Sequence, residues 1–201
     1  MIEGKGLSKA FGTVPVLREL TFRFETGKRG VLLGQSGTGK TTLLRLIAGL
    51  DLPDSGSLWI DGNNMQGVPP HARGIGFLFQ APALWPHMTV LQNALFAMEE
   101  PDEPRVRALL ARVGLGELAD RFPHEVSGGQ ARRAALVRAL APRKPILLLD
   151  EPFAHLGHGP IEAVWELIDE EAATCGATVV AAVHESQEAE RWGGTVVDLN
   201  R

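Results

Sequence analysis

The stretch Gly34-Gln35-Ser36-Gly37-Thr38-Gly39-Lys40-Thr41 fits the pattern G-x-x-x-x-G-K-[ST] at every fixed position. Apolar residues 31–33 precede it and a helical run over residues 42–48 follows it, which is the strand–loop–helix context that this pattern requires. Its glycines let backbone N–H groups turn toward a ligand, and the start of a helix adds positive potential. The stretch therefore predicts a polyphosphate site, with Lys40 on the outer phosphates and the Thr41 hydroxyl on Mg²⁺. The alternative, a glycine-rich turn with a surface lysine, is disfavoured by the flanking strand and helix.

A second candidate phosphate-binding segment, Ser127-Gly128-Gly129-Gln130, opens a helical run that extends to residue 140. A serine at a helix N-cap followed by small residues leaves backbone N–H donors open, although Ser-Gly-Gly alone is ordinary loop composition. The apolar run 146–149 follows and, because it shows no alternation, is typical of a strand buried on both faces. Asp150 and Glu151 come at the carboxyl end of that strand, where open α/β sheets bind ligands. A strand-end turn with solvated carboxylates is the alternative for this pair.

With these motifs the chain resembles the nucleotide-binding subunit of ATP-binding cassette (ABC) transporters over nearly its whole length. The family's motifs occur in the family's order: the aromatic A-loop residue Phe11, the Walker A loop 34–41, the Q-loop glutamine Gln80, the signature 126–130, the Walker B aspartate Asp150 with the catalytic glutamate Glu151, and the switch histidine His184. Valine stands where leucine is usual at 126, and phenylalanine stands where tyrosine is usual at 11. Gly157 stands where the family's D-loop carries an aspartate, so weaker coupling between two ATP sites is expected.

The resemblance implies an α/β fold: a P-loop NTPase (RecA-like) core with an N-terminal antiparallel β subdomain and a helical subdomain that bears the signature. One nucleotide-binding domain is expected over residues 1–201, with the core at about 1–84 and 142–201 and the helical subdomain at about 85–141. From the residues themselves, Leu20, Phe22 and Phe24 alternate with polar residues as a half-buried antiparallel strand does. Between residues 81 and 140, prolines separate segments with helical spacing.

The resemblance implies that the chain binds ATP and Mg²⁺ and hydrolyses the ATP. The implied ATP contacts are Phe11, Gly34, Gln35, Ser36, Gly37, Thr38, Gly39, Lys40, Thr41 and Thr42 of one chain, and Ser127, Gly128, Gly129 and Gln130 of a second. The implied Mg²⁺ set is Thr41, Gln80 and Asp150. The implied catalytic set is Lys40 on the phosphates, Gln80 in the metal and water shell, Glu151 on the attacking water and His184 on the γ-phosphate. Core packing of Phe11 and a merely structural histidine at a strand end remain the alternatives.

The resemblance also implies two partners. A second cassette, expected to be an identical chain, pairs head to tail in the presence of ATP, so that each signature covers the other chain's γ-phosphate. Integral membrane permease subunits are the other partner, because residues 81–90 are similar to the stretch on which an importer's permease lands. From the residues alone, this apolar stretch between prolines is either a docking groove or an internally packed loop. No apolar stretch approaches the roughly 20 residues that cross a bilayer, so a chain that serves a membrane must dock onto a separate partner. The resemblance implies a peripheral protein on the cytoplasmic face of the cell membrane.

The function that follows from the resemblance is ATP-driven import of a solute through a separate permease. Two alternatives stay open: an ABC ATPase that regulates a membrane complex without transport, and a nucleotide-gated binding module with very low turnover. The formal net charge of −4, with no long basic run, argues against a nucleic-acid partner. Cys175 is the only cysteine, which excludes an intrachain disulfide and suits a reducing compartment.

Overall fold

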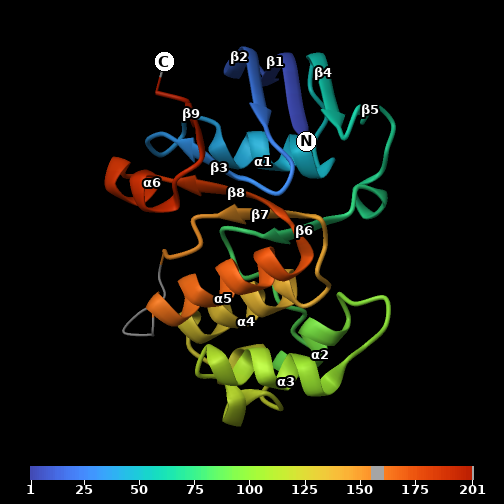
Figure 1. Cartoon of the computed structure of the whole chain (residues 1–201), viewed down its shortest axis with the longest axis vertical. Helices are drawn as coiled ribbons and strands as arrows, with labels where there is room; N and C mark the ends of the chain where they lie inside the picture. Colours follow the sequence, from blue (N-terminus) through green and yellow to red (C-terminus); the bar gives the residue numbers. More distant parts are fainter. Residues whose placement is uncertain (155–160, 201) are drawn as a thin grey trace. The chain divides into compact units, whose positions relative to one another are not determined.

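A computed structural model describes residues 1–154 and 161–200 of the chain, which divides into two compact units (Figure 1). The first unit comprises Met1–Phe77, Pro145–Glu151 and Gly176–Arg201, and the second comprises Leu78–Lys144 and Pro152–Cys175. The unit boundaries at 77/78 and 144/145 lie a few residues from the predicted subdomain boundaries, and residues 152–175 belong to the second unit. The predicted division into subdomains stays a prediction.

An antiparallel sheet occupies part of the first unit, as the alternating sequence predicts. Strand β1 (Ile2–Phe11) pairs with β2 (Val14–Phe24) and with β4 (Ser55–Ile60), and β5 (Asn63–Asn64) completes the order β2-β1-β4-β5. In β2, Phe22 and Phe24 are buried whereas Thr21 and Arg23 are exposed, because successive side chains point to opposite faces. Asp61 and Gly62 form the tight turn between β4 and β5, with φ of 47° and 78°.

A parallel sheet forms the centre of the first unit. Its strands are β3 (Arg29–Leu33), β6 (Ile75–Leu78), β7 (Ile146–Asp150), β8 (Thr178–Val183) and β9 (Thr195–Asp198), in the order β6-β7-β8-β3-β9 (Figure 1). Every residue of β7 and β8 is buried, which explains why all of them are apolar except Asp150 at the end of β7 and Thr178 at the start of β8. Because β7, β8 and β3 run parallel side by side, their carboxyl ends meet at one edge.

Helix α1 (Lys40–Ala48) packs against β7 and β8, and α6 (Ser186–Trp192) packs against β3. Leu43, Leu44 and Ile47 of α1 are fully buried in the core of the unit, and each contributes roughly 1.5–3 kcal/mol of hydrophobic stabilisation. The helix ends at Gly49, whose φ of 77° is the left-handed conformation typical of a C-terminal cap. A short 3₁₀ helix, η1 (Pro70–Ala72), precedes β6.

The second unit is helical. Helices α3 (Glu103–Arg112), α4 (Gly128–Leu140) and α5 (Ile161–Cys175) pack on one another, and α2 (Val90–Leu95) packs on α3 and α4 (Figure 1). Two 3₁₀ helices, η2 (Gly116–Leu118) and η3 (Pro123–Glu125), join α3 to α4. Thr89 and Ser127 each close a capping box with the glutamine three residues later, which fixes where α2 and α4 begin.

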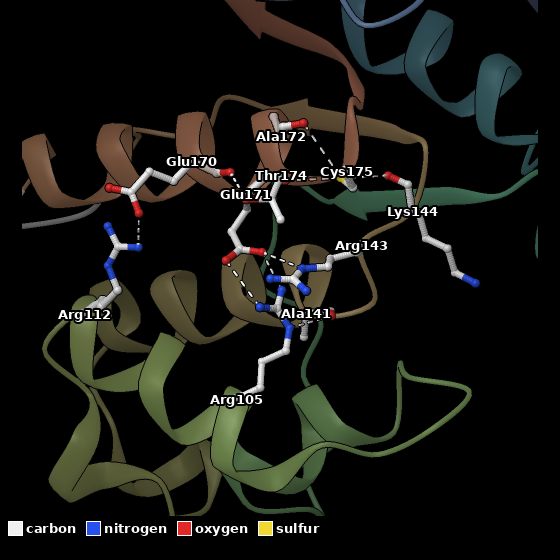
Figure 2. Close-up of polar contacts among 10 residues, drawn as sticks. All are labelled: Arg105, Arg112, Ala141, Arg143, Lys144, Glu170, Glu171, Ala172, Thr174 and Cys175. Carbon is white, nitrogen blue, oxygen red and sulfur yellow. Dashed lines mark hydrogen bonds and ion pairs between the residues drawn. The ribbon is translucent and has the colours of Figure 1, made fainter.

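A buried carboxylate links three parts of the second unit (Figure 2). Glu171 of α5 is 8% exposed and forms ion pairs with Arg105 of α3 and Arg143, which follows α4. Arg105 Nε also donates to the carbonyl of Ala141 at 3.3 Å. Because a buried charge is tolerated only when it is paired, these two arginines allow the Glu171 carboxylate to be buried in its charged form.

Candidate functional site

The Gly34–Thr41 loop joins the end of β3 to the first turn of α1, as its sequence predicts. Gly39 is the N-cap of α1 with φ of 99°, a backbone conformation that other residues rarely adopt. A Cβ atom on Gly34 would lie 2.4 Å from Thr38 Oγ1, so this position has no room for a side chain. No side chain caps α1, which leaves its first N–H groups available to an anion.

The Lys40 side chain folds back over this loop. It is only 5% exposed, and its Nζ donates to the carbonyls of Gly34 at 2.6 Å and Gln35 at 2.9 Å. Burial lowers the pKa of Lys40, whereas the negative charges of Glu151 and Asp150 raise it. The ammonium group is thus held at the mouth of the loop by weak, neutral acceptors that phosphate oxygens can replace.

Thr41 and Asp150 bring two oxygen atoms together from α1 and β7. Thr41 Oγ1 donates to Asp150 Oδ2 at 2.8 Å, and Asp150 is 1% exposed. Mg²⁺ prefers oxygen ligands in an octahedron with bonds of 2.0–2.1 Å, which places neighbouring ligand atoms about 2.9 Å apart. The pair therefore fits two adjacent positions around Mg²⁺. Among the residues that the structure describes, no three His, Cys, Asp or Glu side chains converge as a metal site.

Glu151 and His184 meet at the same edge of the sheet. The Glu151 Oε1 atom forms a hydrogen bond with His184 Nε2, and Lys40 Nζ lies 3.4 Å from His184 Nδ1. Since an ammonium group can only donate, Nδ1 is the acceptor and the ring proton is assigned to Nε2, which donates to Glu151. Glu151 has φ of 53°, a strained conformation for a non-glycine residue, and its N–H donates to the carbonyl of Ala182 at 3.2 Å.

Sequence reasoning missed Glu188, a further carboxylate close to the Glu151–His184 pair. Burial raises the pKa of Glu188, as do the charges of Glu185 and Glu151, whereas the hydrogen bond that its carboxylate accepts from the His184 backbone N–H lowers it. Glu188 lies in the first turn of α6, four residues after His184. In the sequence, only this four-residue spacing points to Glu188 as a neighbour of His184. The spacing is not specific, because acidic residues are common in the first turn of any helix.

The structure excludes core packing for Phe11, which was one of the two interpretations of that residue. Its side chain is 53% exposed, and Lys9 Nζ lies 5.5 Å from the ring centroid. Stacking of Phe11 on adenine stays a prediction. Thr42 is the third residue of α1 and is partly buried.

The other predicted site residues belong to the second unit. Ser127 is the N-cap of α4, and its N–H donates to Gln130 Oε1 at 2.7 Å. Gln80 is exposed, and its backbone carbonyl accepts a hydrogen bond from Arg132 of α4. Further along α4, Arg138 donates to the carbonyls of Ala83 at 2.6 Å and Pro82 at 3.0 Å. The signature helix therefore holds the segment that carries Gln80, and the roles of these residues toward ATP stay predictions.

The predicted departure at Gly157 lies outside the described residues.

Comparison with known proteins agrees with this geometry. The family model described as ABC transporter matches residues 17–154. The spermidine/putrescine import ATP-binding protein PotA of Nitrosospira multiformis is 41% identical over 208 residues, which cover all of this chain and 57% of that protein. The sulfate/thiosulfate import ATP-binding protein CysA of Bordetella bronchiseptica is 48% identical over 165 residues, which cover 77% of this chain and 47% of that protein. The chain thus spans about half the length of these relatives.

A solved structure extends the likeness to three dimensions. The dimeric post-hydrolysis state of the ATP-binding cassette MJ0796, bound to ADP and Pi, superposes with a TM-score of 0.87 at 30% identity. The match covers 100% of this chain and 94% of that one. The predicted α/β fold, with its antiparallel and parallel sheets, is thereby confirmed.

Proposed function

The chain belongs to the ABC transporter family, and we propose that it hydrolyses ATP as the nucleotide-binding subunit of a solute importer. One observation carries the proposal: Lys40, the Thr41–Asp150 pair and the Glu151–His184 pair converge at one edge of the parallel sheet. Phosphoryl transfer needs positioning and charge stabilisation more than covalent help, and these groups supply both.

In binding ATP, the loop amides of residues 36–41 would receive the phosphates. Lys40 Nζ would exchange its two carbonyl acceptors for β- and γ-phosphate oxygens, which are stronger acceptors because they are charged. Thr41 and Asp150, with Gln80, would hold Mg²⁺, which when bound neutralises charge on the phosphates. Phe11 would stack on adenine, because its ring is exposed and stacking needs only a π face.

In hydrolysis, Glu151 is the proposed acceptor that orients the attacking water, and His184 the proposed donor to the γ-phosphate. Their mutual hydrogen bond holds the His184 ring next to the Glu151 carboxylate. His184 can therefore donate to the γ-phosphate while Glu151 accepts from the attacking water. Glu151 thus remains the proton acceptor that activation of the water requires.

A second cassette would complete each site. The N-terminus of α4, capped by Ser127, offers N–H donors to the γ-phosphate of the other chain, which is the family's head-to-tail arrangement. ATP would join the two chains, and its hydrolysis would release them. The partner is proposed to be an identical chain.

Permease subunits are the proposed membrane partner, and the 81–90 stretch is the proposed contact. Asn93 is fully buried and accepts from the Trp85 N–H at 2.7 Å, while its Nδ2 donates to the carbonyls of Trp85, Met88 and Thr89. The residues Trp85 and Phe96 are nonetheless 46% and 63% exposed, and their rings meet edge to face with centroids 5.9 Å apart. A rigid backbone that presents exposed aromatic rings favours a docking surface over an internally packed loop.

No helix within the described part of the chain is long and apolar enough to span a bilayer. The proposed location, peripheral and on the cytoplasmic face of the membrane beside the permease, follows from the proposed role as the ATP-binding subunit of an importer.

The test of this function is the Glu151→Gln variant with ATP and Mg²⁺ in size-exclusion chromatography with light scattering. The variant should accumulate as an ATP-dependent dimer that the wild type forms only transiently, because glutamine keeps the size of the side chain and cannot accept the proton. Glu166→Gln, at an exposed position of α5, should behave as wild type. Absence of a dimer in the presence of the permease would exclude the mechanism, whereas tight ATP binding without phosphate release by the wild type would select the nucleotide-gated module.

A further inference from the structure

We propose that Asn200, which lies outside every sequence motif, is a positioning residue for the phosphate-binding loop. Asn200 Oδ1 accepts a hydrogen bond of 2.9 Å from the backbone N–H of Gln35, a residue 165 positions away in the sequence. The inference rests on the proposed function, because it concerns how the same loop is held for ATP.

Both the carbonyl and the N–H of Gln35 form hydrogen bonds that hold this loop. Its carbonyl accepts from Lys40 Nζ at 2.9 Å and from Thr38 Oγ1 at 2.9 Å. Asn200 holds the N–H of the same residue, so both main-chain polar groups of Gln35 are tied. This restrains the backbone of the loop at the point where Lys40 is anchored, and a restrained loop loses less conformational entropy when it closes on a ligand.

Asn200 is itself held in a single orientation. Its Nδ2 donates to Asp198 Oδ1 at 2.8 Å, and its backbone N–H donates to the same atom at 2.9 Å. Because Asp198 accepts from the amide nitrogen, the amide oxygen is the atom that faces Gln35.

The pairing of β9 with β3 carries Asn200 to the base of the loop. Leu33 is paired with Asp198, and the Leu199 N–H donates to the Leu33 carbonyl at 2.8 Å, one residue before the loop begins. The segment from the end of β9 to Asn200 is therefore short, and hydrogen bonds fix it both to β3 and to the Gln35 N–H. Asn200 is exposed, so its bond should contribute little to global stability and act on the loop.

The experiment compares wild type with Asn200→Ala in three measurements: hydrogen exchange of the Gln35 amide by NMR, ATP affinity by calorimetry, and Tm. The Gln35 amide should be protected in the wild type and lose that protection in the variant. The Kd for ATP should rise about fivefold, the value expected for one hydrogen bond, with kcat nearly unchanged and Tm within about 2 °C. Asn63→Ala, at an exposed position of β5 in the same unit, should change none of these.

Each outcome decides between the claims. Wild-type affinity for ATP in Asn200→Ala, or weaker affinity with unchanged Gln35 exchange, would overturn the role of Asn200 and leave the proposed function standing. A wild-type chain that binds no ATP would overturn the proposed function itself. Should Asn200→Ala fail to fold, Asn200→Ser, whose side chain is too short to reach Gln35, replaces it. Fast exchange of the Gln35 amide in the wild type would overturn the inference without any variant.

Discussion

His184 Nε2 and Glu151 Oε1 share a hydrogen bond between residues 33 positions apart, at the carboxyl ends of the neighbouring strands β8 and β7. The imidazole also faces Lys40, so the proposed donor to the γ-phosphate touches both the proposed base and the proposed phosphate ligand. A change at any one of these three groups should therefore alter the geometry of the other two.

Replacement of His184 tests this arrangement. His184→Ala should reduce kcat about 100-fold, because it removes a γ-phosphate donor and leaves Glu151 without its orienting partner. The Kd for ATP should change only a few-fold, since Lys40 and the loop remain. Steady-state phosphate release and calorimetry measure the two quantities. His71→Ala, at an exposed position of η1, is the matched control, and an unchanged kcat for His184→Ala would contradict the assigned role.

Removal of the metal tests the Thr41–Asp150 pair. Chelation of Mg²⁺ should weaken ATP binding to the wild type, whereas Asp150→Asn should bind ATP with nearly the same Kd with or without Mg²⁺. The asparagine oxygen can still accept from Thr41 Oγ1, so the variant should keep its fold. Asp120→Asn, at a carboxylate that is 75% exposed, should respond to Mg²⁺ as the wild type does. A Mg²⁺ response in Asp150→Asn equal to that of the wild type would show that the metal is held elsewhere.

The pKa of Glu188 predicts a dependence of stability on pH. Burial raises this pKa above 4.5 in the folded protein, so the folded state binds the proton more tightly than the unfolded state does. The resulting stabilisation is fully present below pH 4.5 and is lost as pH rises through the folded-state pKa. In urea unfolding, the free energy of unfolding of the wild type should therefore fall relative to that of Glu188→Gln as pH rises from 4.5 through the folded-state pKa.

Glu190→Gln, at an exposed position of α6 whose charge does not act on Glu188, should track the wild type across the same pH range. A constant difference between wild type and Glu188→Gln from low to neutral pH would contradict the shift.

The buried ion pairs of the second unit predict a large effect on stability (Figure 2). Glu171→Ala should lower the free energy of unfolding by about 3 kcal/mol, because it removes a buried carboxylate and leaves the largely covered Arg105 guanidinium without its ion pair. The neighbouring Glu170 pairs with Arg112 at 2.6 Å, but its side chain is 60% exposed, so Glu170→Ala should cost less than about 1 kcal/mol. Equal losses for the two variants would contradict the account of this network.

Local sequence patterns were sufficient to predict much of the fold and the positions of the phosphate-binding loop and of Asp150 and Glu151 in it. The loop at 34–41 was predicted because strand, glycines and helix follow in a fixed order, and the cap at Ser127 because capping chemistry is local. The unbroken apolar run of β7 predicted both a buried strand and the position of Asp150 and Glu151 at its end. In each of these cases a few adjacent residues carry the whole signal.

Contacts that join distant segments were not predictable in the same way. The Asn200–Gln35 bond depends on β9 pairing with β3, and neither residue type signals the other. The Glu171–Arg105 pair joins helices across 66 residues, and each residue alone resembles an ordinary exposed charge. The positive φ of Glu151 follows from how β7 ends beside β8, which no local propensity encodes.

The central claim is that the loop closed by Lys40 binds the triphosphate of ATP, and calorimetric titration of ATP with Mg²⁺ into the wild-type chain and Lys40→Ala tests it most directly. The account predicts saturable binding at one site per chain in the wild type and at least a 100-fold weaker Kd in the variant, because the Lys40 ammonium group over the loop is lost while Tm stays close to that of the wild type. No measurable heat of binding in a folded wild-type chain, or equal Kd values for the two proteins, would contradict it.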